Sequence, residues 1–97
     1  MWWGGLDSKT FLKRFPKEGL VVDLGSGPSR VADDVINVDL FSYPSVDIVS
    51  GITHLPFKDN SIQRIICDNV LEHVYEPEAA LLEIQRVLAP GGIAYIC

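Results

Sequence analysis

A glycine-rich turn and a downstream carboxylate are the residues of this sequence whose types and spacing could hold a ribose-containing ligand. Gly25 and Gly27 follow the apolar run 20–24, and glycine there lets the backbone turn sharply and bring its N–H groups to an anionic group. Asp39 ends the next apolar run, where a carboxylate can accept hydrogen bonds from both hydroxyls of a ribose. A G-x-G turn alone also occurs as ordinary loop punctuation. It is the pairing of turn and carboxylate that favours a cofactor site.

Two helices are expected around these residues. Asp7 or Ser8 can cap a short helix over 7–15, which a proline then stops. The second helix is predicted over 76–89, because its apolar residues recur at helical spacing and its first turn carries a proline and acidic residues. The Pro-Gly-Gly sequence at 90–92 is expected to end this helix.

Short apolar runs bounded by glycine or polar residues predict the strands. They cover residues 20–24, 35–40, 47–50, 62–67 and 93–96. The last two runs with the helix between them form a βαβ unit, which implies parallel strands. The fold class predicted is α/β: a Rossmann-like, mostly parallel sheet with helices on its faces, shortened after the fifth strand.

Two connections are shorter than this fold normally requires. Seven residues separate Gly27 from Val35, and seven separate Asp39 from Asp47. A parallel crossover usually takes a dozen residues or more. The segment 47–50 is therefore expected to be an irregular edge, an antiparallel turnback or a loop, and not a regular parallel neighbour joined by an ordinary crossover.

Length, charge and cysteine content limit the class of protein. The 97 residues predict one domain, 1–97, with a helical segment at 1–19, and the net charge of −5 argues against unaided binding to nucleic acid or an anionic membrane. The cysteines, Cys67 and Cys97, are too few for a disulfide framework or a metal site. No signal peptide or membrane-length apolar run is expected, so the sequence predicts a cytoplasmic protein.

Several segments occur in the order typical of one enzyme family. They are Asp23-Leu24-Gly25-Ser26-Gly27, then Asp39, then the sequences LPFKDNS at 55–61, NVLEHV at 69–74 and RVLAPGG at 86–92. Together they resemble the small-molecule, type 11 group of class I S-adenosylmethionine-dependent methyltransferases, over about residues 20 to 97. The resemblance implies S-adenosylmethionine as the cofactor and a small-molecule acceptor.

The resemblance also implies roles for individual residues. Gly25, Ser26 and Gly27 would cradle the methionine part of the cofactor, and Asp23 would orient that turn and the bound amino group. Asp39 would hold the ribose. The remaining contacts would come from Leu40 and Ile52, on either side of the adenine, and from the main chain between Cys67 and Asn69, facing the methionine.

Glu72 and His73 are the candidates for a catalytic base, because histidine can titrate near pH 7 and the pair follows a strand at the expected cleft. A general base is needed only if the acceptor must lose a proton. A role in shaping the turn after the strand is the preferred interpretation for this pair, and His54 is expected to be a loop residue.

Departures from the family pattern shape the expected assembly. Ser29 replaces a third glycine, and Gly51 stands where an Asp commonly bonds the adenine amino group, which predicts up to about tenfold weaker binding. The chain stops at Cys97, within the fifth strand of the family. An uncovered apolar strand there would favour a homodimer, a swapped assembly or a fragment of a longer reading frame.

Three alternatives to a methyltransferase remain open from the sequence. The first is a module that binds S-adenosylmethionine or its demethylated product without turnover. The second is a fragment of a nicotinamide-dependent dehydrogenase, which shares the glycine turn but does not account for NVLEHV or RVLAPGG. The third is a purely structural remnant that binds neither ligand.

Overall fold

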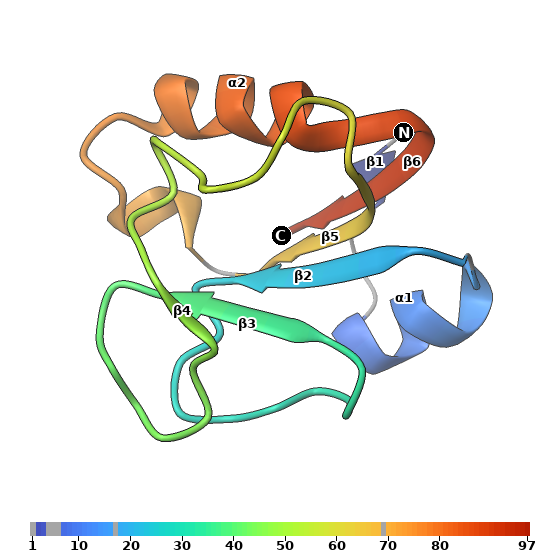
Figure 1. The fold of residues 1–97 in the computed structure, drawn as a ribbon, viewed down its shortest axis with the longest axis horizontal. Helices are drawn as coiled ribbons and strands as arrows, with labels where there is room; N and C mark the ends of the chain where they lie inside the picture. The colour runs from blue at the N-terminus through green and yellow to red at the C-terminus, as the bar shows by residue number, and fades with distance from the viewer. Residues whose placement is uncertain (1, 4–6, 17, 69) are drawn as a thin grey trace.

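The computed structural model describes residues 2–3, 7–16, 18–68 and 70–97, with the backbone alone at residues 2 and 3. In chain order the elements are β1 (Trp2–Trp3), α1 (Ser8–Arg14), β2 (Leu20–Leu24), β3 (Ile36–Asp39), β4 (Ile48–Val49), β5 (Ile62–Cys67), the 3-10 turn η1 (Leu71–His73), α2 (Pro77–Val87) and β6 (Leu88–Ile96). The strands form one sheet in the order β1-β6-β5-β2-β3-β4, and every neighbouring pair is parallel (Figure 1). The Rossmann-like parallel fold predicted from the sequence is confirmed.

The two helices cover opposite faces of the sheet. Successive strand residues point to opposite faces, so Ile65 of β5 packs in the cluster that contains Ile84 of α2, whereas Ile66 packs in the cluster that contains Phe11 of α1. Asp7 caps α1 as expected, with its side chain accepting a hydrogen bond from the Thr10 N–H at 2.7 Å. The buried faces of both helices thus fix the sheet between them.

The carboxyl ends of the central strands lie side by side. Leu24, the last residue of β2, is in register with Val38 of β3 on one side and with Cys67 of β5 on the other. The glycine turn, Asp39 and the segment after Cys67 therefore leave the sheet at the same edge, where ligands of open α/β sheets bind.

The Pro-Gly-Gly segment does not end the helix, contrary to the expectation from the sequence. Helix α2 ends at Val87, and Leu88 is already extended and paired with Ile62 of β5. Between that pair and the next pair, Arg64 with Ile93, β6 contains extra residues that form a bulge. Pro-Gly-Gly lies in this bulge.

β4 is a parallel neighbour of β3, despite the short connection that precedes it. Val38 pairs with Ile48 and Asp39 with Val49, so the antiparallel and loop alternatives are wrong and the irregular edge is correct. No helix occupies residues 40–47. Side-chain hydrogen bonds hold the connection in place.

The polar tie, defined here as Arg30, Asn37 and Asp47, provides these bonds. Asn37 is fully buried, and its side-chain amide donates to the main-chain carbonyls of Ser29 and Ser45 at 3.0 and 3.1 Å. Asp47 accepts from the Asn37 N–H at 2.8 Å and pairs with Arg30 at 3.0 Å. One buried amide and one ion pair thus fasten the connections before β3 and before β4 to each other.

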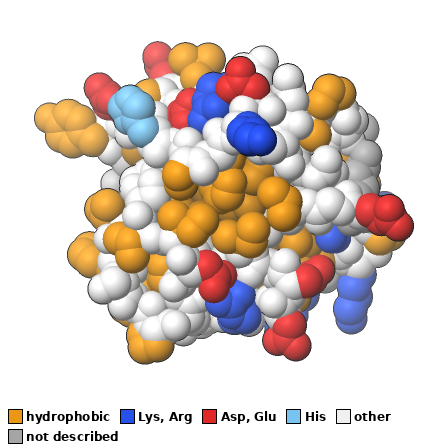
Figure 2. Space-filling model, in the orientation of Figure 1, with side chains coloured by type: hydrophobic (Ala, Val, Ile, Leu, Met, Phe, Trp, Pro, Cys, Tyr) orange, Lys and Arg blue, Asp and Glu red, His pale blue; other side chains and the backbone are white. Residues whose placement is uncertain are grey.

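The edge of β6 is not uncovered, which corrects the expected reason for dimerisation. Trp2 and Trp3 of β1 pair with Ala94 and Tyr95 of β6. Strand β1 therefore occupies part of the edge that the sequence led us to consider free, and the segment 1–19 contains a strand as well as a helix. Hydrophobic side chains also gather near the centre of the face shown in Figure 2. Self-association stays a prediction without its original structural basis.

Candidate functional site

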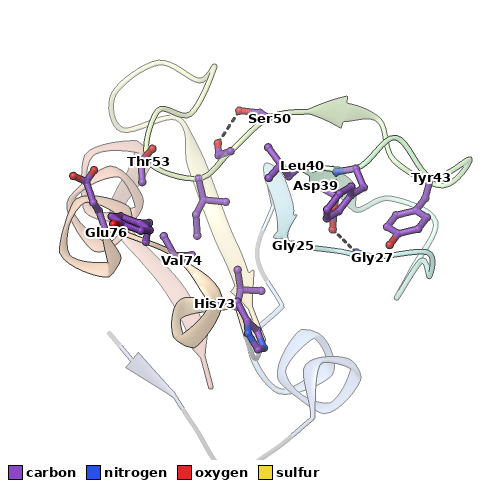
Figure 3. A pocket seen from close by; sticks show the side chains of 15 residues that line it. Gly25, Gly27, Asp39, Leu40, Tyr43, Ser50, Thr53, His73, Val74 and Glu76 are labelled. Carbon is purple, nitrogen blue, oxygen red and sulfur yellow. Dashed lines mark hydrogen bonds between the residues drawn. The ribbon is translucent and has the colours of Figure 1, made fainter.

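A cavity of about 640 Å³ opens at the carboxyl edge of the sheet (Figure 3). Its walls come from the glycine turn, from the segments after β3 and β4, and from the segment around η1. The lining residues are Gly25, Gly27, Asp39, Leu40, Phe41, Tyr43, Ser50, Gly51, Ile52, Thr53, Val70, His73, Val74, Tyr75 and Glu76. We refer to this space as the larger cavity. It brings together five of the predicted cofactor residues: Gly25, Gly27, Asp39, Leu40 and Ile52.

The glycine turn requires its glycines for two different reasons. Gly25 has φ +69°, and a Cβ on it would lie 2.4 Å from a methyl carbon of Val70, so no side chain fits there. Gly27 has φ +64°, but a Cβ on it would meet no atom within 4 Å. Gly27 thus leaves open space in the cavity wall that a larger residue would fill. The turn is bound to β3 by the N–H groups of Gly25 and Ser26, which both donate to the Val38 carbonyl at 2.7 and 3.1 Å.

Asp39 is almost fully buried and joins the turn to the next loop. Its Oδ2 accepts a hydrogen bond from the Gly27 N–H at 2.8 Å, and its Oδ1 accepts one from the Phe41 N–H at 2.9 Å. Figure 3 shows the bond to Gly27 at the cavity wall. Each carboxylate oxygen has two lone pairs, so both oxygens keep capacity for a further donor.

Apolar side chains line the part of the larger cavity next to Asp39. Leu40 is exposed into it and Ile52 is buried in its wall. Gly51 also lines it, close to Leu40, and has no side chain that could bond a base edge. Phe41 and Tyr43 stand nearby with ring centroids 6.3 Å apart, and sequence reasoning missed both.

A second, more polar cavity of about 560 Å³ lies on the other side of the glycine turn, and we call it the smaller cavity. Its lining residues are Asp7, Ser8, Lys9, Asp23, Gly25, Ser26, Ser29, Arg30, Val31, Ile66 and Asp68. Gly25 belongs to both cavities, so the two spaces meet at the turn. The sequence predicted a role for the main chain at Asp68 but not for its carboxylate. This side chain could have been found, because it directly follows β5 at the carboxyl edge of the sheet, where ligands of such folds bind.

Asp23 gives the smaller cavity its electrostatic character. Burial, together with the nearby carboxylates of Asp68 and Asp39, raises the pKa of its carboxyl to about 7. Such a group favours a bound cation, whose charge offsets both causes. Burial, together with Asp23 and Asp68, also raises the pKa of Cys67 to about 12, so this thiol stays protonated at neutral pH.

The other predicted residues occupy different positions. The Cys67 side chain packs in the core and lines neither cavity, while Asn69 lies outside the described residues. Glu72 and His73 are both exposed on η1, with His73 Nε2 3.8 Å from Glu72 Oε1. His73 lines the larger cavity and Glu72 does not. His54 is an exposed loop residue beside Thr53.

The part of the chain that the structure describes lacks two further kinds of site. No three or more His, Cys, Asp or Glu side chains there are grouped so that they could hold a metal ion. No helix within the same residues has the length and apolar character needed to cross a bilayer.

Comparison with known proteins identifies the family. The model of a methyltransferase domain family matches residues 4–96, nearly the whole chain. The chain belongs to this methyltransferase family. A 37.1 kDa protein in transposon TN4556 of Streptomyces fradiae is 36% identical over 89 residues, which are 91% of this chain and 25% of that protein. A demethylmenaquinone methyltransferase of Renibacterium salmoninarum is 44% identical over 50 residues, which are 50% of this chain and 21% of that enzyme.

A solved structure shows the same fold. It is a Methanococcus maripaludis protein assigned to the S-adenosyl-L-methionine-dependent methyltransferases, with a TM-score of 0.70 and 22% identity, and the match covers 90% of this chain and 52% of that one. This methyltransferase-family chain therefore spans a quarter of the Streptomyces protein and about half of the Methanococcus structure.

The family implies S-adenosylmethionine as the cofactor, and the residues present fit it. A nucleoside needs an apolar space for its base and, beside it, an acceptor of hydrogen bonds from its ribose hydroxyls. The larger cavity offers the first at Leu40 and the second at Asp39. The α-ammonium of the amino-acid end needs carboxylates, which the smaller cavity offers at Asp23 and Asp68. The open space at Gly27 provides room for the backbone to approach the ligand.

Proposed function

We propose that this chain binds S-adenosylmethionine across the glycine turn and supports transfer of its methyl group to a small-molecule acceptor. The observation that carries the proposal is the meeting of two chemically different cavities at Gly25. The adenosine would occupy the larger, apolar cavity, with the ribose on Asp39. The methionine would occupy the smaller, acidic cavity, with its ammonium facing Asp23 and Asp68.

The charges of the two cavities support this orientation. S-adenosylmethionine carries a sulfonium and an ammonium, and an acidic, partly buried site attracts cations. Asp23, Asp68 and Asp39 lie close enough for the other two to raise the pKa of Asp23. A cation placed among them relieves this repulsion, so binding is favourable on the acidic side of the turn.

The adenine would lie between Leu40 and Ile52 in the larger cavity. Gly51 offers only its backbone there, so recognition of the base would depend on apolar contact more than on side-chain hydrogen bonds. We therefore expect weaker binding than in relatives that carry an acidic residue at that position.

The cofactor supplies an activated methyl group when bound. The chain then needs to position the acceptor in line and exclude water, a contribution that can reach about 7–11 kcal/mol when alignment is good. His73 lines the larger cavity and could accept a proton from the acceptor, whereas Glu72 does not line it. His73 is thus the better of the two candidates for a base.

A second candidate function is binding without turnover. The observation in its favour is the open rim of the larger cavity, where Tyr75 is fully exposed and Leu40 and Phe41 are 65% exposed. Nothing among the described residues covers these side chains. The acceptor side would then be completed by another part of a longer protein or by a partner.

Isothermal titration with S-adenosylhomocysteine, the demethylated product, tests the binding part of the proposal. Asp39→Ala should weaken binding by tenfold or more, because hydrogen bonds to a charged group contribute roughly 1.5–3 kcal/mol each. Asp34→Ala, at an exposed loop position that lines neither cavity, is the matched control. Equal affinity of Asp39→Ala and wild type would overturn the ribose assignment.

A titration and an activity assay separate the candidate functions. Binding of NADH in place of S-adenosylhomocysteine would indicate the dehydrogenase alternative. Methyl transfer from labelled S-adenosylmethionine to a panel of small acceptors would distinguish an enzyme from a binding module.

A further inference from the structure

The smaller cavity has a cationic residue supplied by the N-terminal helix, which no motif of the sequence points to. Resting on the proposed function, we infer that Lys9 of α1 binds the α-carboxylate of the cofactor's methionine end. Lys9 would thereby make the site selective for nucleosides that carry an amino acid.

The position of Lys9 is fixed by the capping and packing of α1. Asp7 starts the helix by accepting from the Thr10 N–H at 2.7 Å, and the Asp7 carbonyl accepts from the Phe11 N–H at 3.0 Å. Phe11 is fully buried against Tyr95 of β6, with ring centroids 5.5 Å apart. The first turn of α1 is therefore held at the rim of the smaller cavity, and Lys9 lines it.

Lys9 is the basic residue of this cavity that forms no close ion pair with another described residue, and the nearby exposed carboxylate of Asp7 interacts with it only at longer range. The cavity has two basic lining residues, Lys9 and Arg30. Arg30 is already engaged: its guanidinium donates to the carbonyls of Val35 and Ser45 at 2.6 and 2.8 Å and pairs with Asp47 at 3.0 Å. None of the ion pairs between described residues involves Lys9.

The charges of the smaller cavity match a zwitterion. Asp23 and Asp68 present carboxylates, which suit an α-ammonium group. An α-carboxylate on the same carbon would be repelled by these acids unless a cation faces it. Lys9 lies on the wall formed by α1 and supplies that cation.

The assignment has a consequence for ligand choice. 5′-Methylthioadenosine shares the adenosine and the sulfur of S-adenosylhomocysteine but lacks the amino-acid end. A contact between Lys9 and the carboxylate can strengthen binding of S-adenosylhomocysteine only. A residue that merely stabilised α1 would affect both ligands alike.

The test is a titration of both ligands against wild type, Lys9→Met and Lys13→Met. Lys13 is an exposed residue of the same helix that does not line the cavity, so it is the matched control. For Lys9→Met we expect affinity for S-adenosylhomocysteine to fall about twofold to fivefold, the range of an exposed ion pair, with no change for 5′-methylthioadenosine. The loss should shrink in 1 M salt, and Lys9→Arg should retain most of the affinity.

Three results would count against the inference. Unchanged affinity of Lys9→Met for S-adenosylhomocysteine overturns it, and so does an equal loss for both ligands. A wild-type protein that binds 5′-methylthioadenosine as tightly as S-adenosylhomocysteine leaves the proposed adenosine site intact but removes the amino-acid contact. A wild-type protein that binds neither ligand overturns the proposed function and this inference together.

Discussion

Replacing Asp23 with asparagine should stabilise the fold and weaken the site, and the first effect should depend strongly on pH. Burial and two neighbouring carboxylates raise the pKa of Asp23 from 3.8 to about 7. Each pKa unit corresponds to 1.36 kcal/mol, so ionised Asp23 costs the folded state up to about 4 kcal/mol. Asp23→Asn keeps the size of the side chain and removes the charge.

The sign follows from proton binding. Between about pH 4 and pH 7 the folded chain keeps the Asp23 proton while the unfolded chain has lost it, so the free energy of unfolding falls as pH rises through this window. The gain from Asp23→Asn should therefore be about 2–3 kcal/mol larger at pH 8 than at pH 5. Below pH 4 both states hold the proton and the gain should be smallest.

Urea unfolding at pH 5 and pH 8 measures this difference. Asp33→Asn, at an exposed loop position, is the control and should show the same free energy of unfolding as wild type at both pH values. The same Asp23→Asn protein should bind S-adenosylhomocysteine at least several-fold more weakly, since it lacks a charge for the ammonium. A gain that is equal at pH 5 and pH 8, or a variant less stable than wild type at pH 8, would refute the account of Asp23.

Three other substitutions test the glycine turn and the loop after β4, which is bound to α2 because the Glu83 carboxylate accepts a hydrogen bond from the Leu55 N–H at 2.6 Å. Gly25→Ala should lower the free energy of unfolding by roughly 1–3 kcal/mol, because φ is +69° and the new Cβ would lie 2.4 Å from Val70. Gly27→Ala should cost less stability and mainly reduce cofactor affinity. Thermal melts and titrations compare the two variants, and a Gly27→Ala protein that melts at a lower temperature than Gly25→Ala contradicts the geometry. Hydrogen bonds from Arg86 lower the pKa of Glu83 to about 2, so Glu83 stabilises the fold above about pH 4.5 and loses this contribution as pH falls toward 2. The free energy of unfolding should therefore fall less steeply with decreasing pH in Glu83→Gln than in wild type. The same acid dependence in both proteins would contradict this role of Glu83.

The sequence predicted the central strands and the first helix well, because their signals are local. The runs 20–24 and 62–67 match β2 and β5 residue for residue, since each is apolar, β-branched and bounded by turn residues. Asp7 was expected as a cap and is one. The helix end at 90–92 was misjudged, because Leu88 already pairs with β5 through a tertiary contact that no local pattern reveals.

The site was predicted where it depends on strand ends and missed where it depends on packing. Gly25 follows β2 and Asp39 ends β3, and both line the larger cavity. Asp68 obeys the same rule but carries no motif. Lys9 reaches the smaller cavity only because Phe11 docks α1 on the sheet, and a contact so distant in sequence leaves no periodic signal.

The polar tie has a consequence for how small a protein of this architecture can be. Parallel neighbours are normally joined by a helix whose apolar face must be buried, which sets a minimum chain length. Here the eight residues 40–47 join β3 to its parallel neighbour β4 without a helix. The buried Asn37 amide and the Arg30–Asp47 pair hold this loop with a few directed bonds, in place of the apolar face that a helix would bury. For protein design, this suggests that crossover helices on the nucleotide side of such a sheet can be exchanged for short loops anchored on a single buried asparagine.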